Sequence, residues 1–273
     1  MSAPIGVFDS GYGGLTILQG LRRALPEYDY LYLGDNARAP YGTRSFALVH
    51  EYTLEAVREL FRRGCPLVIL ACNTASAKAL RTIQQQYLPG SDDPTRRVLG
   101  VIRPTVEVLP QVTRSGHIGV LATPGTIASH SYHIEIEHID PSLQVTEQSA
   151  PMWVPLVENG EALGPGADYF VRKYLDTLLS ADPQIDTIVL GCTHYPIIAP
   201  KIREYLPQGI TLLAQGELVG LSLADYLRRH PEMDSRLSRS GTCRYLTTES
   251  SEKFDALASL FTGEAITSTQ IEL

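Results

Sequence analysis

Hydrophobic residues along this chain fall mainly into short continuous runs that alternate with amphipathic stretches. Two of these runs have nearly the same form, since residues 67–74 read LVILACNT and residues 187–194 read TIVLGCTH. An unbroken apolar run rich in β-branched residues is typical of a strand buried on both faces of a parallel sheet. Each run then ends on a small residue, a cysteine and polar residues that can begin a helix. The pattern therefore predicts two equivalent strand ends, each followed by a thiol.

Two further pairs of predicted strands repeat in the same order along the chain. Residues 5–8 and 118–121 are short apolar runs, each followed by a turn sequence that contains glycine, and residues 98–102 and 210–213 form the other pair. Strands that alternate with helices predict parallel sheets with right-handed crossovers. Three matched units in one order favour an internal duplication. The alternative is that strand–helix units resemble one another in general.

Composition and charge narrow the class of protein. The chain has 273 residues, of which 44% are hydrophobic and 19% charged, as in ordinary soluble globular proteins. A formal net charge of −7 argues against nucleic acid as the main partner, because phosphate binding needs a basic face. We find neither an apolar run of ~20 residues nor a signal sequence, so we expect no membrane partner and a cytoplasmic location. The four cysteines are widely spaced and are expected to be free thiols.

A thiol in each half of a duplicated site permits a reaction that one thiol does not. If Cys72 and Cys192 flank a carbon that bears an acidic hydrogen, one sulfur can remove a proton while the other delivers one to the opposite face. Configuration is then inverted. Both cysteines are expected at helix N-termini, which lower the pKa of a thiol and bind carboxylates. Asp9, Glu158 and His194 are candidates to hold or shuttle protons nearby.

Other roles for the same residues are open. Free cysteines are often no more than small buried hydrophobic residues. A nucleophilic Cys192 paired with His194 could catalyse acyl transfer, but this leaves Cys72 unexplained. The same pair could bind zinc, yet no third or fourth ligand follows at a suitable spacing, and we expect no metal.

The ordered motifs of the chain closely resemble those of the bacterial glutamate racemases. A single motif would carry little weight, but the whole ordered set is specific, above all its last member. The motifs are Asp9-Ser10-Gly11, Gly34-Asp35 with Pro40-Tyr41-Gly42, Cys72-Asn73-Thr74-Ala75, Ala122-Thr123 with Thr126, Val154-Pro155-Leu156-Val157-Glu158, and Leu190-Gly191-Cys192-Thr193-His194-Tyr195-Pro196.

The resemblance implies a racemase without a cofactor that interconverts L- and D-glutamate and supplies D-glutamate for peptidoglycan, and hence for cell-wall biogenesis and cell shape. It implies a homodimer. It also implies roles for individual residues. The implied catalytic residues are Cys72 and Cys192, assisted by Asp9, Glu158 and His194; the implied substrate contacts are Asp9, Ser10, Tyr41, Gly42, Asn73, Thr74, Thr123, Thr193 and His194, with Thr126 a weaker candidate.

The fold that the resemblance implies is an α/β fold of two pseudo-symmetric domains, with parallel sheets and the active site in the cleft between them. We expect residues 1–98 and 210–273 to form the first domain and residues 99–209 the second. Two segments depart from the pattern of many family members. They are Ile102-Arg103-Pro104-Thr105, where many members carry an acidic residue and Pro-Gly-Ala, and Ala214-Gln215-Gly216-Glu217, where many carry Asp-Ser-Gly.

Two alternative functions remain at this point. The same pair of thiols could racemise aspartate or a related amino acid, because the depth of the pocket cannot be deduced from the sequence. The cleft could also belong to a non-catalytic amino-acid-binding or regulatory protein. Binding alone does not need both thiols, so their presence favours an enzyme.

Overall fold

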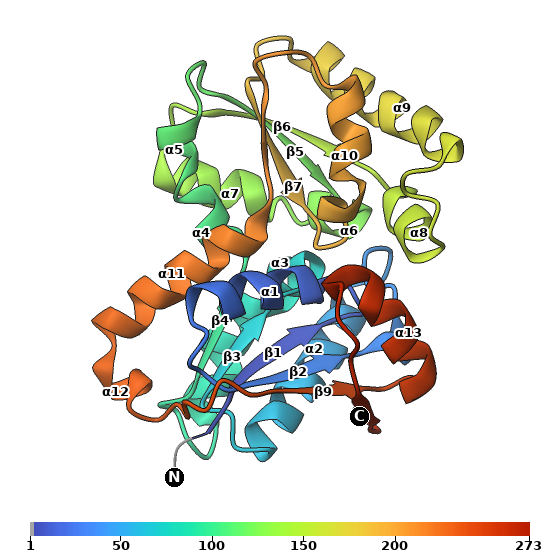
Figure 1. Cartoon of the computed structure of the whole chain (residues 1–273). Coiled ribbons are helices and arrows are strands. Elements are labelled where there is room, and N and C mark those ends of the chain that lie inside the picture. The colour runs from blue at the N-terminus through green and yellow to red at the C-terminus, as the bar shows by residue number, and fades with distance from the viewer. Residues whose placement is uncertain (1–2) are drawn as a thin grey trace.

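The computed structural model describes residues 3–273 and contains two parallel sheets, each covered by helices, that lie one above the other (Figure 1). The first sheet has the strand order β10-β9-β2-β1-β3-β4 and the second has the order β6-β5-β7-β8. The first sheet comprises β1 (Ile5–Asp9), β2 (Tyr30–Gly34), β3 (Leu67–Leu70), β4 (Arg97–Gly100), β9 (Cys243–Thr247) and β10 (Ser268–Gln270); the second comprises β5 (His117–Ala122), β6 (Gln144–Ser149), β7 (Thr187–Gly191) and β8 (Thr211–Leu213).

Helices connect the strands and cover the sheets, and the C-terminal segment returns to the first sheet (Figure 1). The helices are α1 (Gly14–Ala24), α2 (Phe46–Arg62), α3 (Asn73–Thr82), α4 (Ile102–Val106), α5 (Leu109–Val112), α6 (Pro124–Ile127), α7 (Ser131–Ile139), α8 (Trp153–Glu158), α9 (Pro165–Ala181), α10 (Tyr195–Tyr205), α11 (Gln215–Arg229), α12 (Pro231–Asp234) and α13 (Ser251–Thr262), with the short helical segments η1 (Asn36–Arg38), η2 (Ile83–Tyr87) and η3 (Leu88–Gly90).

The two sheets share a common arrangement of four strands. The order β2-β1-β3-β4 in the first sheet matches the order β6-β5-β7-β8 in the second, and all pairings are parallel. The three strand pairs that the sequence matched, β1 with β5, β3 with β7 and β4 with β8, therefore occupy equivalent places. The predicted α/β fold with two pseudo-symmetric parallel sheets is confirmed.

The predicted boundaries between the domains need correction at two strands. Residues 99 and 100 were assigned to the second domain, but β4 pairs with β3 and so lies in the first sheet. Residues 211–213 were assigned to the first domain, but β8 pairs with β7 in the second sheet. The strand predicted over residues 98–102 also ends at Gly100, because residue 102 already begins α4. The chain thus crosses between the halves just before α4 and just before α11.

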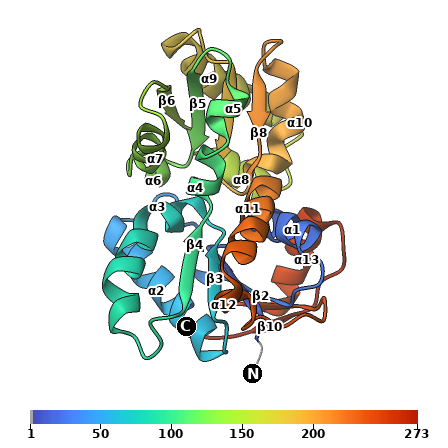
Figure 2. The same ribbon diagram turned by 90° about the vertical axis from the view of Figure 1, so that its left-hand side faces the viewer.

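These two crossings lie side by side at the waist of the molecule, where α4 contacts α11 (Figure 2). Helix α11 then packs along α1 of the first half. The two backbones are so close that a Cβ atom at Gly20 would lie 1.9 Å from the carbonyl oxygen of Gly216. Only glycine permits such an approach, so the start of α11 is held firmly against the first half.

Burial explains why β1, β3 and β7 are such apolar runs. Every residue of these three strands is buried. Strands β6 and β10 were missed by the sequence analysis because they are polar edge strands with the sequences QVTEQS and STQ. Within residues 3–273, no helix is long and apolar enough to cross a membrane.

Candidate active site

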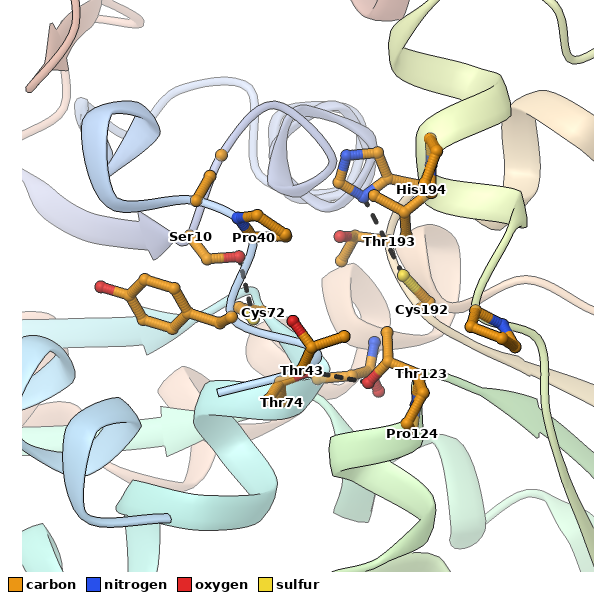
Figure 3. Close-up of a pocket in the computed structure, with 18 of the residues that line it drawn as sticks. Ser10, Pro40, Thr43, Cys72, Thr74, Thr123, Pro124, Cys192, Thr193 and His194 are labelled. Atoms are coloured by element: carbon orange, nitrogen blue, oxygen red, sulfur yellow. Dashed lines mark hydrogen bonds between the residues drawn. The ribbon is translucent and has the colours of Figure 1, made fainter. Parts of the chain in front are cut away.

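A cavity of about 130 Å³ lies between the two halves, at the carboxyl ends of the parallel strands, where open α/β sheets place their ligand sites. Both halves contribute to its wall, and both Cys72 and Cys192 line it. Figure 3 shows the two thiols within this one pocket. The other lining residues are Ser10, Gly11, Ala39, Pro40, Tyr41, Gly42, Thr43, Asn73 and Thr74 from the first half, and Thr123, Pro124, Ala150, Pro151, Val154, Pro155, Glu158, Thr193 and His194 from the second.

Cys72 lies at the junction of β3 and α3 and has neutral hydrogen-bonding partners. It is the N-cap residue of α3, and its sulfur accepts the backbone N–H of Ala75 at 3.4 Å. The hydroxyl of Ser10 lies 3.3 Å from the same sulfur (Figure 3). Burial raises the pKa of the Cys72 thiol to about 12, and the nearby carboxyl of Asp9 adds to the rise. Cys72 is therefore a protonated thiol near neutral pH.

Cys192 follows β7 and lies beside a charged pair. Its sulfur is 3.9 Å from Nδ1 of His194, and Nε2 of the same ring is 2.9 Å from a carboxylate oxygen of Glu158. Burial by itself would lower the pKa of His194, but the contacts with Cys192 and Glu158 outweigh burial and raise that pKa to about 10. His194 therefore carries a positive charge at neutral pH, next to the sulfur.

The helix capping at the two cysteines differs from the prediction. Cys72 caps α3 as expected, but α10 begins at Tyr195 and its N-cap residue is His194. Cys192 lies two residues before that cap, since residues 192–194 form a turn in which the N–H of Tyr195 bonds to the carbonyl of Cys192. The prediction that both thiols lie directly at helix N-termini is therefore wrong for Cys192.

Asp9 lies behind the wall of the cavity. It is fully buried, and one of its carboxylate oxygens accepts the N–H of Gly11 at 2.9 Å. Burial raises the pKa of the Asp9 carboxyl group, whereas the positive charge of His194 acts in the opposite direction. The carboxyl group of Asp9 thus acts on Cys72 and His194 through its electric field, and its side chain shapes the turn that carries Ser10.

Tyr41 is held by a buried polar network. Its hydroxyl donates to the carboxylate of Asp35, which is fully buried and also accepts a hydrogen bond from Arg38 at 2.7 Å. Arg38 in turn pairs with Glu55 of α2. In the sequence, Asp35 stands out only as part of a motif. Its role in the structure is to hold the ring of Tyr41, and with it the loop that forms one wall of the cavity.

Contacts between the two halves close one side of the cavity. The hydroxyl oxygen of Thr74 lies 3.0 Å from that of Thr123, which is 3.1 Å from that of Thr126 (Figure 3 draws the first contact). The N–H of Gly125 also donates to the carbonyl of Gly42 at 2.8 Å. These contacts hold the loop that carries Tyr41 against the second half.

The structure brings the predicted residues together. Ser10, Tyr41, Gly42, Cys72, Asn73, Thr74, Thr123, Glu158, Cys192, Thr193 and His194 all line the one cavity. Asp9 and Thr126 are fully buried behind this wall. Some small and apolar residues of the wall, such as Ala150 and Pro151, could not be predicted from the sequence, because an apolar lining residue has no chemical signature of its own.

Known proteins similar to this chain place it in a family. The family model described as Asp/Glu/hydantoin racemase matches residues 6–218. The chain belongs to the Asp/Glu/hydantoin racemase family. Among the curated members, the glutamate racemase of Ruegeria pomeroyi is 40% identical over 89% of this chain and 91% of its own length. The glutamate racemase of a further Ruegeria strain is 38% identical, over 96% and 98%.

Solved structures of family members support the same assignment. A glutamate racemase isoform from Bacillus anthracis superposes with a TM-score of 0.89 at 32% identity, covering 99% of this chain and 98% of that one. The glutamate racemase of Francisella tularensis, in complex with D-glutamate, gives 0.87 at 30% identity with the same coverage. The predicted resemblance to glutamate racemases is confirmed, and this member of the racemase family is an isomerase.

An aspartate racemase from Picrophilus torridus has a TM-score of 0.53 at 14% identity, covering 83% of this chain and 94% of that one. At this level of identity only the fold is shared. Within the racemase family, the chain is therefore more similar to the glutamate racemases than to this aspartate racemase.

Proposed function

We propose that this racemase interconverts L- and D-glutamate without a cofactor, with Cys72 and Cys192 as the two groups that exchange protons with the α-carbon. One observation carries the proposal: two thiols from opposite halves of a duplicated fold line a single small cavity. Similarity to glutamate racemases over nearly the whole chain supports glutamate as the substrate.

The proposed reaction needs one thiolate and one thiol. The thiolate takes the α-proton of the bound amino acid, and the electron pair of the broken C–H bond stays on the α-carbon. The thiol on the opposite face then gives its proton to that carbon, which inverts the configuration. The first sulfur ends as a thiol and the second as a thiolate, so the enzyme is left ready for the reverse reaction.

The charges around the sulfurs suggest which one starts as the base. The protonated His194 lies beside Cys192 and stabilises a thiolate there. Cys72 has neutral partners and a pKa of about 12, so it starts as the acid. In this assignment Glu158 keeps His194 protonated, and Asp9 acts through its field.

The substrate contacts that we propose follow the walls of the cavity. Backbone N–H groups at the start of α3, at Asn73 and Thr74, can bind a carboxylate, since a helix N-terminus attracts anions. The hydroxyls of Ser10, Thr123 and Thr193 are further donors, and the loop of Tyr41 and Gly42 forms the remaining wall.

Racemisation in deuterated water tests the proposal. Without any added cofactor, L-glutamate should be converted to D-glutamate that carries deuterium at the α-carbon. The optical rotation of the solution should fall to zero. The same assay with L-aspartate tests the closest alternative substrate, and we expect a much slower reaction. If glutamate binds but its α-hydrogen never exchanges, the protein is a non-catalytic binding protein and the proposal is wrong.

The place of the enzyme in the cell is also a proposal that follows from the family. D-glutamate is a component of peptidoglycan, so the enzyme would act in the cytoplasm, supply cell-wall synthesis and influence cell shape. Depletion of the enzyme in its host should then be rescued by external D-glutamate. We further propose a homodimer, for which light scattering should give twice the mass of one chain.

A further inference from the structure

A closed ring of three hydrogen bonds lies behind Asn73, the residue that follows Cys72. The amide nitrogen of Asn73 donates to the side-chain oxygen of Gln215 at 2.6 Å. The nitrogen of Gln215 donates to the hydroxyl of Tyr132 at 2.9 Å, and that hydroxyl donates to the amide oxygen of Asn73 at 2.8 Å. Every donor points the same way round the ring, so each bond polarises the next and strengthens it.

The members of the ring come from three different parts of the fold. Asn73 is the first residue of α3 in the first half, Tyr132 belongs to α7 in the second, and Gln215 is the first residue of α11, where the chain crosses back. All three side chains are at most 2% exposed. Water therefore cannot readily replace any of the three bonds, and breaking one leaves a buried polar group without a partner.

Gln215 also reaches the other crossing between the halves. Its amide nitrogen lies 2.9 Å from the hydroxyl oxygen of Thr105 and 3.2 Å from the carbonyl oxygen of Val101, next to α4. Thr105 and Gln215 lie in the two segments that depart from the pattern of many family members. In this chain the two departures are in direct contact, and the close packing of Gly216 on Gly20 holds Gln215 in place.

We infer that Gln215 is a positioning residue for the racemase reaction. Through Asn73 it fixes the start of α3, directly after Cys72, and through Tyr132 and Thr105 it ties that point to the second half and to both crossings. Gln215 is not part of the cavity wall, so it acts only through its neighbours. This inference rests on the proposed function, because the geometry that it fixes is that of the two thiols.

The first test compares Gln215→Met with a matched control. Methionine has a similar length but can neither donate nor accept these bonds, so Asn73 and Tyr132 lose their partner. We expect kcat to fall by ~10–100-fold, with KM changed by less than ~3-fold, because a small displacement of reacting groups costs rate. The control Gln19→Met removes one hydrogen bond, which the side-chain amide of Gln19 donates to the carbonyl of Thr262 at 2.9 Å, and should leave kcat unchanged. Equal kcat values in the two variants would overturn the inference.

The second test uses Gln215→Glu, which can restore the ring in a pH-dependent way. A carboxylate only accepts hydrogen bonds, whereas a carboxylic acid has one donor and one acceptor and can replace the amide in the ring. Burial raises the pKa of a carboxyl group, so the acid form is accessible in mildly acidic buffer. The ratio of the activity of Gln215→Glu to that of the unsubstituted enzyme should therefore rise as the pH falls, while the ratio for Gln215→Met stays flat. Flat ratios for both variants would contradict the inference.

A third measurement does not depend on activity. Hydrogen exchange should become faster in the peptides that cover α3 and α7 when Gln215 is replaced by Met, because both helices lose a contact. Faster exchange that is confined to α11 would contradict the inference. If the unsubstituted protein does not racemise glutamate at all, the proposed function fails, and the exchange measurement still decides whether Gln215 positions α3.

Discussion

The surroundings of Cys72 and Cys192 differ much more than their places in the fold. Cys72 follows β3 and Cys192 follows β7, and these two strands occupy equivalent places in the repeated four-strand unit. Both residues therefore lie at the carboxyl ends of the strands. Cys72 is contacted by a hydroxyl and a backbone N–H, which are neutral, whereas Cys192 lies beside the charged pair of His194 and Glu158. Duplication of the fold thus supplies two equivalent sulfur positions, and the neighbouring side chains give them different electrostatic surroundings.

This comparison separates two requirements of a racemase. In the two-thiol mechanism proposed above, the sulfurs must occupy equivalent positions, because a proton has to be removed from either face of the α-carbon. The protonation states must be different, because one sulfur has to start as base and the other as acid. The backbone bears on the first requirement and a few side chains bear on the second, so the two can be tested separately.

The largest effect is expected when either thiol is removed. Cys72→Ser and Cys192→Ser should each lower kcat by ~10³-fold or more, since a serine hydroxyl is a far weaker acid and base for this step. The loss should be similar for the two variants and in both directions, as measured by circular dichroism from L- and from D-glutamate. If either variant keeps a tenth of the activity, the two sulfurs do not have equivalent roles.

Replacing His194 should have the next largest effect and should change the pH profile. The His194 pKa is raised to about 10, so its positive charge is present below that pH and is lost as the pH rises through about 10. We expect kcat/KM of the unsubstituted enzyme to fall over the same range. His194→Asn should lower kcat/KM by ~100-fold at neutral pH and should lack this fall above pH 9. If His194→Asn kept the same fall in kcat/KM above pH 9, the loss of the positive charge on His194 could not be its cause.

Glu158→Gln should lower the activity, as His194→Asn does, but by a smaller factor. Glu158 raises the pKa of His194, so a neutral amide at this position should lower that pKa and move the basic limb of the profile to lower pH. Loss of a charged hydrogen bond predicts a fall in activity of ~10-fold near neutral pH. Glu147, which lies 3.3 Å from His130 outside the cavity, provides the matched control, and Glu147→Gln should leave the profile unchanged.

The smallest effect is expected when Ser10, a neutral neighbour of Cys72, is replaced. Ser10→Ala removes the hydroxyl that lies 3.3 Å from the sulfur of Cys72, a contact between neutral groups. The expected fall in kcat is ~3–10-fold, which corresponds to the net worth of one neutral hydrogen bond. The pH profile should keep its basic limb. If Ser10→Ala reduced the rate as much as His194→Asn, the surroundings of Cys72 and Cys192 would not differ in the way described.

Much of the fold could be predicted because buried parallel strands are continuous apolar runs. Strands β1, β3 and β7 were found in this way, and their order along the chain revealed the duplication. Strand β6 was missed since an edge strand needs to bury little apolar surface, and QVTEQS has neither an apolar run nor a turn signal of its own. The boundaries between the halves were misplaced by a few residues because pairing partners cannot be deduced from composition.

The site could be predicted only where function is tied to short local motifs. Cys72 and Cys192 each stand in such a motif, and both line the cavity. The hydrogen-bonded ring of Asn73, Tyr132 and Gln215 could not be foreseen, because its members lie on three helices that are distant in sequence. A buried polar network has no spacing rule, so it becomes visible only when the fold brings its members together.

The bond between the N–H of Gly125 and the carbonyl of Gly42 has a consequence for how this cleft can vary. A hydrogen bond between main-chain atoms needs no particular side chain, but proline at position 125 would abolish it because proline has no N–H. Bulk is nevertheless restricted at both ends, since a Cβ atom at Gly125 would lie 2.8 Å from the Gly42 oxygen and one at Gly42 would lie 2.9 Å from Thr123. To admit a larger amino acid, these two glycines should therefore be kept and the pocket widened at Val154 or Pro151, which line it from the second half.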